Sequence, residues 1–245
     1  MHVLDSAHHG PDQPTPDVGV ASKATAANCA NSSLTSGNIP RTTMPPLPPV
    51  TKALMLICTA VFCAQLLLPM LPVDALFALW PPGSGRFWPW QLVSYGFLHG
   101  DMSHLFFNML GLWMFGSELE RLWGRNRYLQ MLLASVVAAA LVQLLFTMVT
   151  GSRAPTVGAS GALFGLLLSF GMLFPNRVIM PLFPPIPMKA RTFVMVFGGV
   201  ELLFGLTGGG GVAHFAHLGG MLGAWLMISW WRGKLPFSGG PRFRR

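Results

Sequence analysis

The stretch "YLQMLLASVVAAALVQLLFTMV", residues 128–149, is a run of 22 residues without a charged side chain. A helix needs roughly 20 apolar residues to cross about 30 Å of hydrocarbon, so this stretch is long enough to span a bilayer. The rest of the chain has the same character, because 52% of its 245 residues are hydrophobic and only 10% are charged. Soluble globular domains contain about 25% charged residues. The sequence therefore predicts an integral membrane protein.

Five further stretches share this apolar character, so six spans are expected. They cover residues 53–72, 99–119, 128–149, 158–174, 192–206 and 212–231, and the fourth and fifth of them are short. The fold class that follows is an all-α membrane protein. Its six transmembrane helices are expected to form one bundle over residues 51–231.

The two ends of the chain differ from this apolar region. Residues 1–50 are rich in Pro, Ser, Thr, Asn and Gly and show no apolar periodicity, which is typical of disorder. We expect a disordered cytoplasmic tail over residues 1–50 and a basic cytoplasmic tail over residues 232–245. Cys29, Cys58 and Cys63 do not cluster, so they predict neither a disulfide framework nor a metal site.

The basic residues indicate how the chain is oriented in the membrane. They lie in the connections between the spans and form no patch on a soluble domain, so the net charge of +8 does not predict nucleic-acid binding. If the N-terminus is inside, 14 of the 16 Lys and Arg residues fall in cytoplasmic segments, and only Arg86 and Arg153 lie outside. This distribution predicts that both termini are cytoplasmic. The compact six-span form favours a bacterial inner membrane, with an organellar membrane as the alternative.

Polar and ionisable residues within the predicted spans are the candidates for function, because such groups are costly in a bilayer and usually face a bundle interior. The informative ones are His99, His104, Asn108, Ser160, Glu201, His214 and His217. The second, fourth and sixth spans all run inward, and each begins with polar residues. These side chains therefore converge at one depth near the outer membrane surface.

Ser160 and His217 fit the requirements of nucleophilic catalysis. A serine hydroxyl is a weak nucleophile until a base takes its proton, and a neutral imidazole is the usual base. Both residues lie within about one helical turn of the outer boundary, since a helix rises 1.5 Å per residue. The glycine pairs 161/165 and 219/223 are spaced to let the fourth and sixth spans pack closely.

A serine that attacks a carbonyl also needs hydrogen-bond donors for the oxyanion that develops. Ser160 is expected at a helix N-terminus, where free backbone N–H groups are available, and Gly158 permits the tight turn before it. His104 and Asn108 are four residues apart and therefore share one helix face. Both carry donors suited to an oxyanion.

Three motifs together resemble those of a known family. "GASGALFG" is similar to the GxSG serine motif, "HGDMSHLFFNMLG" to the HxxxxHxxxN motif and "AHFAHLGG" to the AHxGG histidine motif of rhomboid intramembrane serine proteases. The resemblance covers about residues 52–231, and the order and topology of the spans match as well. One departure is "WPWQ", which has Gln91 after Trp90 where many members have Trp-Arg, so the usual anchor of that loop is missing.

The resemblance implies that Ser160 and His217 form a catalytic dyad and that His104 and Asn108 belong to the oxyanion hole. It implies hydrolysis of peptide bonds in other transmembrane proteins, near the outer membrane interface. Transmembrane substrates and membrane lipids are the expected partners, and no cofactor or metal is expected. By the same likeness, His99 is a structural residue.

Two other functional classes and one rival chemistry fit the sequence less well. A non-catalytic rhomboid-like protein that binds transmembrane clients would be expected to lack the serine or the histidine, and this chain has both. A small transporter or channel would more often show an internal repeat. A zinc protease would use a His-Glu-x-x-His helix, and the sequence contains no such string.

The roles of two residues and two segments are expected to lie outside the catalytic dyad. Glu201 falls in the outer half of the fifth span, so contact with His217 is geometrically allowed, but the resemblance implies a dyad without an acid. We therefore interpret Glu201 as a packing residue, either hydrogen-bonded or protonated, and His214 as structural or lining a wet cavity. The short fifth span is expected to gate lateral access, and the segment "TGGGGVA" before the sixth span is expected to cover the site.

Overall fold

The computed structural model describes residues 46–182, 185–207 and 213–234. The chain divides into the units Met1–Met44 and Pro45–Arg245, and the described residues belong to the second. Most of the predicted disordered tail, most of the basic C-terminal tail and the glycines of "TGGGGVA" lie outside the described residues, so the expectations for those segments stay predictions.

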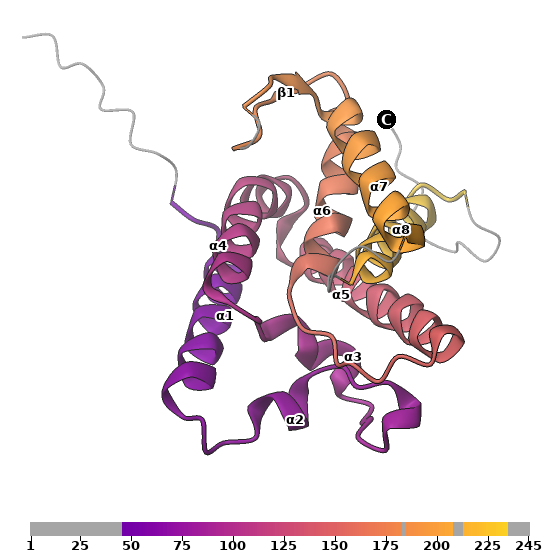
Figure 1. Cartoon of the computed structure of the whole chain (residues 1–245). Helices are drawn as coiled ribbons and strands as arrows, with labels where there is room; N and C mark the ends of the chain where they lie inside the picture. The colour runs from indigo at the N-terminus through magenta and orange to yellow at the C-terminus, as the bar shows by residue number, and fades with distance from the viewer. Residues whose placement is uncertain (1–45, 183–184, 208–212, 235–245) are drawn as a thin grey trace, which may run out of the picture. The chain divides into compact units, whose positions relative to one another are not determined.

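The described part of the chain is mostly helical (Figure 1). Its elements in chain order are α1 (Pro49–Leu67), α2 (Val73–Phe77), η1 (Pro82–Ser84), α3 (Gln91–Ser94), η2 (Tyr95–Phe97), α4 (Met102–Gly111), the π-helical turn η3 (Leu112–Gly116), α5 (Ser117–Thr150), α6 (Ser160–Leu173), β1 (Val178–Ile179), β2 (Met188–Lys189), α7 (Ala190–Thr207) and α8 (His214–Trp231). The strands β1 and β2 pair antiparallel in the connection between α6 and α7.

A helix coincides with each predicted span, but the predicted ends were wrong at several places. α1 ends at Leu67, before the predicted residue 72, because Pro69 disfavours a helical residue in front of it. α4 begins only at Met102, where the side chain of Asp101 accepts the His104 N–H and caps the helix. His99 therefore precedes the helix instead of opening it.

The predicted second and third spans are joined without an intervening loop. Helical structure runs from Met102 to Thr150 and changes direction at Gly124, whose φ of 74° and ψ of 168° are non-helical. A positive φ is readily adopted by glycine because it has no Cβ. The connection expected between residues 119 and 128 is thus a sharp kink at a single glycine.

Length and apolar composition support a membrane location. Among the described residues, three helical stretches are long and apolar enough to cross a bilayer, namely Pro49–Leu67, Met102–Thr150 and Ala190–Thr207. The apolar helix α6 is shorter, with 14 residues. The protein is therefore an integral membrane protein with a mainly helical fold.

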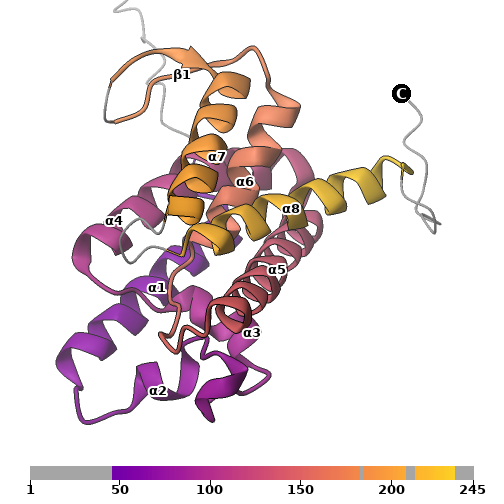
Figure 2. The same cartoon turned by 45° about the vertical axis from the view of Figure 1, so that its right-hand side comes forward.

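The helices α5, α6 and α8 pack against one another at the centre of this unit (Figure 2). Glycines make the close approach possible. A Cβ at Gly220 of α8 would overlap the carbonyl oxygen of Gly161 of α6, and one at Gly219 would lie 2.8 Å from the carbonyl oxygen of Ala138 of α5. A Cβ at Gly223 would likewise lie 2.5 Å from the carbonyl oxygen of Ala134.

This packing corrects the predicted pairing of glycines. Gly219 and Gly223 were expected to face the fourth span, but they face α5. The residue that meets α6 is Gly220, whose carbonyl oxygen would lie 2.9 Å from a Cβ at Gly165. The spacing of the glycines predicted close packing correctly, whereas the partner of each glycine depends on how α8 is rotated about its axis.

The start of α1 is attached to α5 through the buried side chain of Glu120. Its carboxylate accepts the backbone N–H groups of Val50 and Thr51 at 2.9 and 2.7 Å, and the Thr51 hydroxyl at 2.8 Å. The first N–H groups of a helix have no partner within it, and an anion there is favoured by the helix dipole. A polar residue of one helix thus caps another.

The loop between α1 and α4 is held by Gln91. Its Oε1 accepts the N–H groups of Trp80 and Trp88 at 3.2 Å, and its Nε2 donates to the carbonyl oxygens of Leu76 and Arg86 at 3.2 and 3.0 Å. The departure from Trp-Arg therefore leaves this loop with an anchor, because one buried amide makes four hydrogen bonds to the loop backbone.

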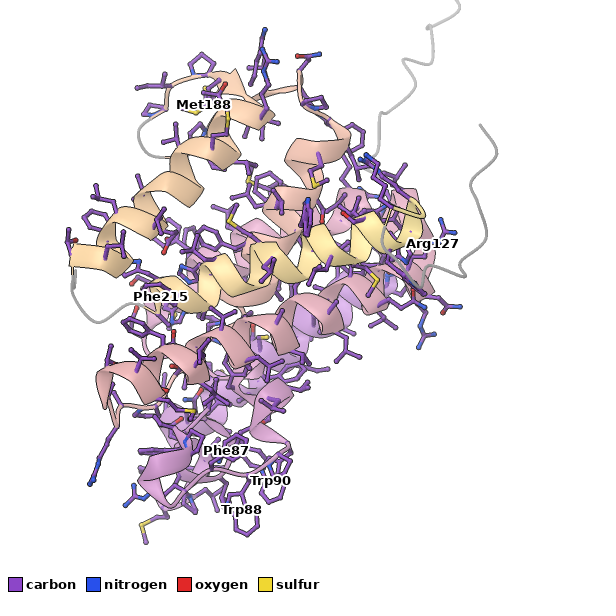
Figure 3. All side chains as sticks on the ribbon, turned by 90° about the vertical axis from the view of Figure 1, so that its right-hand side faces the viewer. Phe87, Trp88, Trp90, Arg127, Met188 and Phe215 are labelled. Atoms are coloured by element: carbon purple, nitrogen blue, oxygen red, sulfur yellow. The ribbon has the colours of Figure 1, made fainter. Side chains whose placement is uncertain are left out.

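Aromatic side chains gather on the outside of the same loop. Trp88 and Trp90 are exposed and stack with 5.0 Å between ring centroids, and Figure 3 shows them beside Phe87 at the edge of the unit. Tryptophan prefers the membrane interface, where its ring meets apolar chains and its N–H meets water. Exposed tryptophan rings on a loop are therefore typical of a loop at the membrane interface.

Candidate active site

Ser160 is the first residue of α6, and the local sequence explains its position. Gly158, two residues earlier, has a φ of 125°, a conformation that side chains with a Cβ rarely adopt. Its N–H donates to the carbonyl oxygen of Tyr95 at 2.9 Å, which attaches the start of α6 to η2. The glycine before the serine thus permits the turn that places the hydroxyl at the N-terminus of the helix.

His217 lies in the first turn of α8 and faces Ser160. The Ser160 Oγ and the His217 Nε2 are 2.8 Å apart, within hydrogen-bond distance. The imidazole also stacks on Phe164, one turn after Ser160 in α6, with 4.2 Å between centroids and 8° between ring planes. The contact between the backbones at Gly161 and Gly220 brings these two helix starts together.

His104 lies in the first turn of α4, against the turn that precedes Ser160. An ideal Cβ at Gly158 would lie 2.6 Å from the His104 ring, so the histidine occupies the space left by the glycine. Asp101 orients this turn by accepting the His104 N–H at 2.8 Å and the Ser103 hydroxyl at 2.5 Å. Asp101 precedes the helix, and these hydrogen bonds, above all that from Ser103, hold the pKa of its carboxyl below its usual value.

Asn108 is buried one turn after His104 on the same face of α4. Its Nδ2 donates to the His104 carbonyl oxygen at 2.8 Å, while its Oδ1 is buried and has no hydrogen-bond partner in the described part of the chain. An amide has two N–H donors, so this bond engages one of them. The structure thus places His104 against the turn at Gly158 that precedes Ser160. Asn108 lies one helical turn further along α4, in the protein interior.

His99 is nearly fully buried beside His104, with 5.2 Å between ring centroids. Its backbone is attached to α1, because its N–H donates to Gln65 Oε1 at 3.2 Å and its carbonyl accepts from Gln65 Nε2 at 3.3 Å. Neither ring nitrogen of His99 has a hydrogen-bond partner within the described residues.

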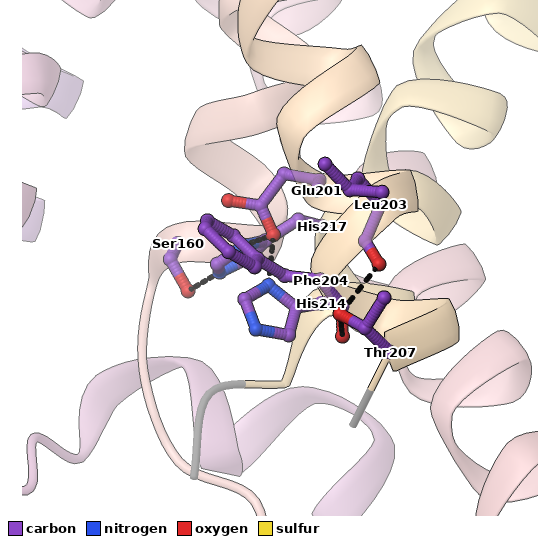
Figure 4. Close-up of polar contacts among 7 residues, drawn as sticks. All are labelled: Ser160, Glu201, Leu203, Phe204, Thr207, His214 and His217. Carbon is purple, nitrogen blue, oxygen red and sulfur yellow. Dashed lines mark hydrogen bonds and ion pairs between the residues drawn. The ribbon is translucent and has the colours of Figure 1, made fainter. Parts of the chain in front are cut away.

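Glu201 of α7 meets both histidines of α8 (Figure 4). Its Oε2 lies 2.7 Å from Nδ1 of His214 and 2.8 Å from Nδ1 of His217. The contact with His214 has hydrogen-bond geometry, whereas Nδ1 of His217 is close in distance but not aligned for a hydrogen bond. All three side chains are largely buried, with 9 to 12% of their side-chain surface exposed.

Sequence reasoning did not place Glu201 next to His217, although two signals pointed that way. In the predicted orientation the residue falls in the outer half of the fifth span, at the expected depth of His217. His214 precedes His217 by three residues on the same helix face. The sequence does not show how α7 is rotated about its own axis, because that rotation is set by packing against its neighbours. The structure supplies that rotation.

The same three residues are the candidates for holding a metal ion among the described residues. Glu201, His214 and His217 each offer a ligand atom, and these atoms lie within 4.8 Å of one another. In the structure they contact each other directly, and these contacts account for their proximity without a further group. The expectation that the site needs no metal remains a prediction.

Comparison with known proteins identifies the family. Residues 86–233 match the model of the Rhomboid domain, and the segment contains Ser160, His217, His104 and Asn108. The chain therefore belongs to the rhomboid family.

Curated relatives agree with this assignment. The chain is 29% identical over 186 residues to "Rhomboid protease GlpG" of Yersinia pestis, an alignment that covers 74% of this chain and 62% of the relative. It is 31% identical over 147 residues to "Rhomboid protein 1, mitochondrial" of Saccharomyces cerevisiae, covering 59% of this chain and 42% of that protein. The chain thus spans less than two thirds of the length of the curated relatives it matches.

Proposed function

We propose that this protein is an intramembrane serine endopeptidase that cleaves transmembrane segments of other proteins near the outer membrane interface. The observation that carries the proposal is the distance of 2.8 Å between Ser160 Oγ and His217 Nε2 at the adjoining starts of α6 and α8. A nucleophile and a base within hydrogen-bond reach are the defining feature of nucleophilic catalysis by serine. Family membership and the names of the relatives support the same reaction class.

The proposed reaction proceeds in two steps. The Ser160 oxygen forms a bond to the substrate carbonyl carbon while His217 Nε2 takes the hydroxyl proton, and the carbonyl π electrons move to the oxygen. When the tetrahedral intermediate collapses, the C–N bond breaks and His217 returns the proton to the leaving amine. A water molecule then attacks the acyl-enzyme, His217 again takes and returns a proton, and the acid product leaves.

We propose that the oxyanion is stabilised by His104, Asn108 and the backbone N–H groups at the start of α6. A helix N-terminus presents unpaired N–H donors and favours negative charge. His104 lies against Gly158, and Asn108 retains an N–H beyond the one it donates to its own helix. Removing one donor of this kind costs about 10² to 10³ in rate.

The substrate class follows from the position of the site. A peptide bond within a helix has its carbonyl engaged and shielded, so a transmembrane substrate must first expose its backbone. Helix-breaking residues near the outer interface are therefore expected in cleaved segments. We propose that substrates reach the site laterally, beside α7. Only Ala190, Phe193 and Val194 of that helix are buried, so few of its side chains are fully packed against the rest of the protein.

The proposed orientation has both termini in the cytoplasm of a bacterial cell and the protein in the inner membrane, as the distribution of Lys and Arg predicts. Ser160 then lies near the outer face. The proposed partners are transmembrane substrates and membrane lipids. The client-binding alternative is less favoured, because a protein that only binds clients has no need for a serine and a histidine in contact.

The test is cleavage of a model transmembrane substrate in detergent and in liposomes by the wild type and by Ser160→Ala. We expect the variant to be inactive and to lose labelling by a fluorophosphonate. Ser169→Ala is the matched control, because Ser169 lies on the same helix and its hydroxyl donates to the carbonyl oxygen of Gly165 within that helix. Activity of Ser160→Ala at the wild-type rate, or inhibition by a metal chelator, would contradict the proposal.

A further inference from the structure

We infer that Glu201 is a positioning residue for His217, which extends the Ser–His pair to a Ser160–His217–Glu201 relay built from three helices. This inference rests on the proposed function. Ser160 lies at Nε2 of the imidazole and Glu201 at Nδ1, so the hydroxyl and the carboxylate contact opposite nitrogens of one ring. The contacts are both 2.8 Å, and Figure 4 shows the three side chains in this order.

The carboxylate determines which nitrogen of His217 carries the proton. A neutral imidazole has one N–H donor and one acceptor, and the partner of one nitrogen selects the tautomer. An ionised carboxylate only accepts, so it favours a proton on Nδ1 of His217. The lone pair is then on Nε2, which faces the Ser160 hydroxyl, as a general base requires.

His214 holds the carboxylate in place. The Nδ1 of His214 makes an aligned hydrogen bond of 2.7 Å to the same oxygen, Oε2, that contacts His217. The two nitrogens therefore lie within 2.8 Å of one acceptor oxygen, which makes its aligned hydrogen bond to His214. Phe204 of α7 contacts the His214 ring at 5.7 Å between centroids, which adds packing to this attachment.

The charge that develops on His217 also favours a carboxylate at this position. When Nε2 takes the serine proton, the ring becomes an imidazolium whose second N–H faces Glu201. The titratable groups that face His217 are Glu201 from α7, His214 from α8 and His104 from α4, whereas Ser160 and Phe164 of α6 are neutral. Among these described neighbours, Glu201 is the one that can carry negative charge.

The position of Glu201 on α7 couples the chemistry to that helix. The buried residues of α7 lie in its first two turns, Ala190–Val194, so the half that bears Glu201 has little apolar burial. The polar contact with α8 is one attachment of that half, beside the packing of Phe204 on His214. A displacement of α7 that breaks the contact would leave His217 without its acceptor, and the relay is therefore assembled only when α7 lies against α8.

The test compares Glu201→Gln, Glu201→Ala and Glu201→Asp in full-length protein. The amide of Gln has nearly the same shape as the carboxylate but can donate to Nδ1 of His217 and hold the wrong tautomer. We expect kcat for a model transmembrane substrate to fall by about 10²-fold or more in Glu201→Gln with little change in KM, since the equivalent change in a Ser–His–Asp triad costs about 10⁴. The Ala variant should be less impaired than Gln, and Asp should recover part of the activity.

A packing role predicts the opposite order, because Ala opens a cavity and Gln does not. A second readout is independent of cleavage: ¹⁵N NMR of histidine-labelled protein should show His217 with the proton on Nδ1 in the wild type and lose that preference in Glu201→Gln. Glu118→Gln is the control, because Glu118 pairs with Arg177 in the connection after α6 and should behave as the wild type.

The outcomes separate the two proposals. If Ser160→Ala cleaves like the wild type, the proposed function is wrong. If Ser160→Ala is inactive while Glu201→Gln keeps the wild-type kcat and the wild-type tautomer of His217, the role of Glu201 is wrong and the protease assignment stands. Greater impairment of Glu201→Ala than of Glu201→Gln would likewise overturn the inference.

Discussion

Gly220 of α8 lies so close to Gly161 of α6 that a Cβ on Gly220 would overlap the carbonyl oxygen of Gly161. This contact of backbones lies between the turns that carry Ser160 and His217. The geometry of the proposed catalytic pair therefore depends on the absence of a side chain at one position. Overpacking of a well-filled interior typically costs about 1–3 kcal/mol.

We expect Gly220→Ala to separate α6 from α8 and to lower the cleavage rate by about 10²-fold, since a displacement of 1 Å at a reacting pair can cost that much. Fluorophosphonate labelling of Ser160 should fall in parallel. Gly199→Ala on α7 is the matched control, because a Cβ there meets nothing within 4 Å. Equal rates for the two variants would show that the contact does not set the geometry.

Removal of the Glu120 carboxylate should destabilise the fold without changing the site. Glu120→Gln retains the size of the side chain but weakens its hydrogen bonds to the N-terminal N–H groups of α1, and bonds to charged groups contribute about 1.5–3 kcal/mol each. We expect a lower midpoint of denaturant unfolding in detergent and a normal KM at low temperature. Thr51→Val, which removes one hydroxyl donor to the same carboxylate, should show a smaller effect.

Gln91 should control the order of the loop between α1 and α4. Gln91→Ala removes four hydrogen bonds to the loop backbone, so the loop should open more often. Limited digestion with trypsin measures this directly, because Arg86 is exposed in that loop. Faster cleavage after Arg86 is expected in Gln91→Ala and not in Gln130→Ala, which changes an exposed glutamine of α5.

If substrates enter beside α7, blocking that route should slow the reaction of a transmembrane substrate but not that of a small reagent. A cysteine pair that cross-links the outer halves of α4 and α7, made in a background without Cys29, Cys58 and Cys63, should slow cleavage of a transmembrane substrate. A small fluorophosphonate should still react with Ser160 at the original rate, because the relay of Glu201 and His217 stays assembled. Cleavage that is unaffected by the cross-link would exclude lateral access at this position.

The resting site should function without a metal ion. We expect a chelator to leave the cleavage rate unchanged, because the candidate ligand atom of Glu201 already contacts the nitrogens of both His214 and His217. The measurement is the rate before and after dialysis against the chelator, with metal content determined in parallel. Loss of activity that returns on addition of a divalent ion would contradict a serine mechanism.

The sequence by itself determined the helical segments of this protein and the helix starts at which its polar residues lie. The charge and apolarity of a segment are read from its own residues, and they decide whether it can cross a bilayer. The helical segments could therefore be predicted from local patterns. The same holds for the glycine turn at Gly158 and for the placement of Ser160 and His217 at helix starts. The kink at Gly124 was not predicted, because a glycine between two spans is compatible with either a loop or a bent helix.

Only the tertiary structure decided which residues meet across helices. The rotation of each helix about its axis depends on how all its neighbours pack, and no local pattern encodes it. For this reason Gly220 and not Gly219 faces α6. The anchoring of the loop by Gln91 was also seen only in the folded chain. The same rotation of α7 brings Glu201 to His214 and His217, which turns an isolated carboxylate in an apolar segment into a neighbour of the proposed base.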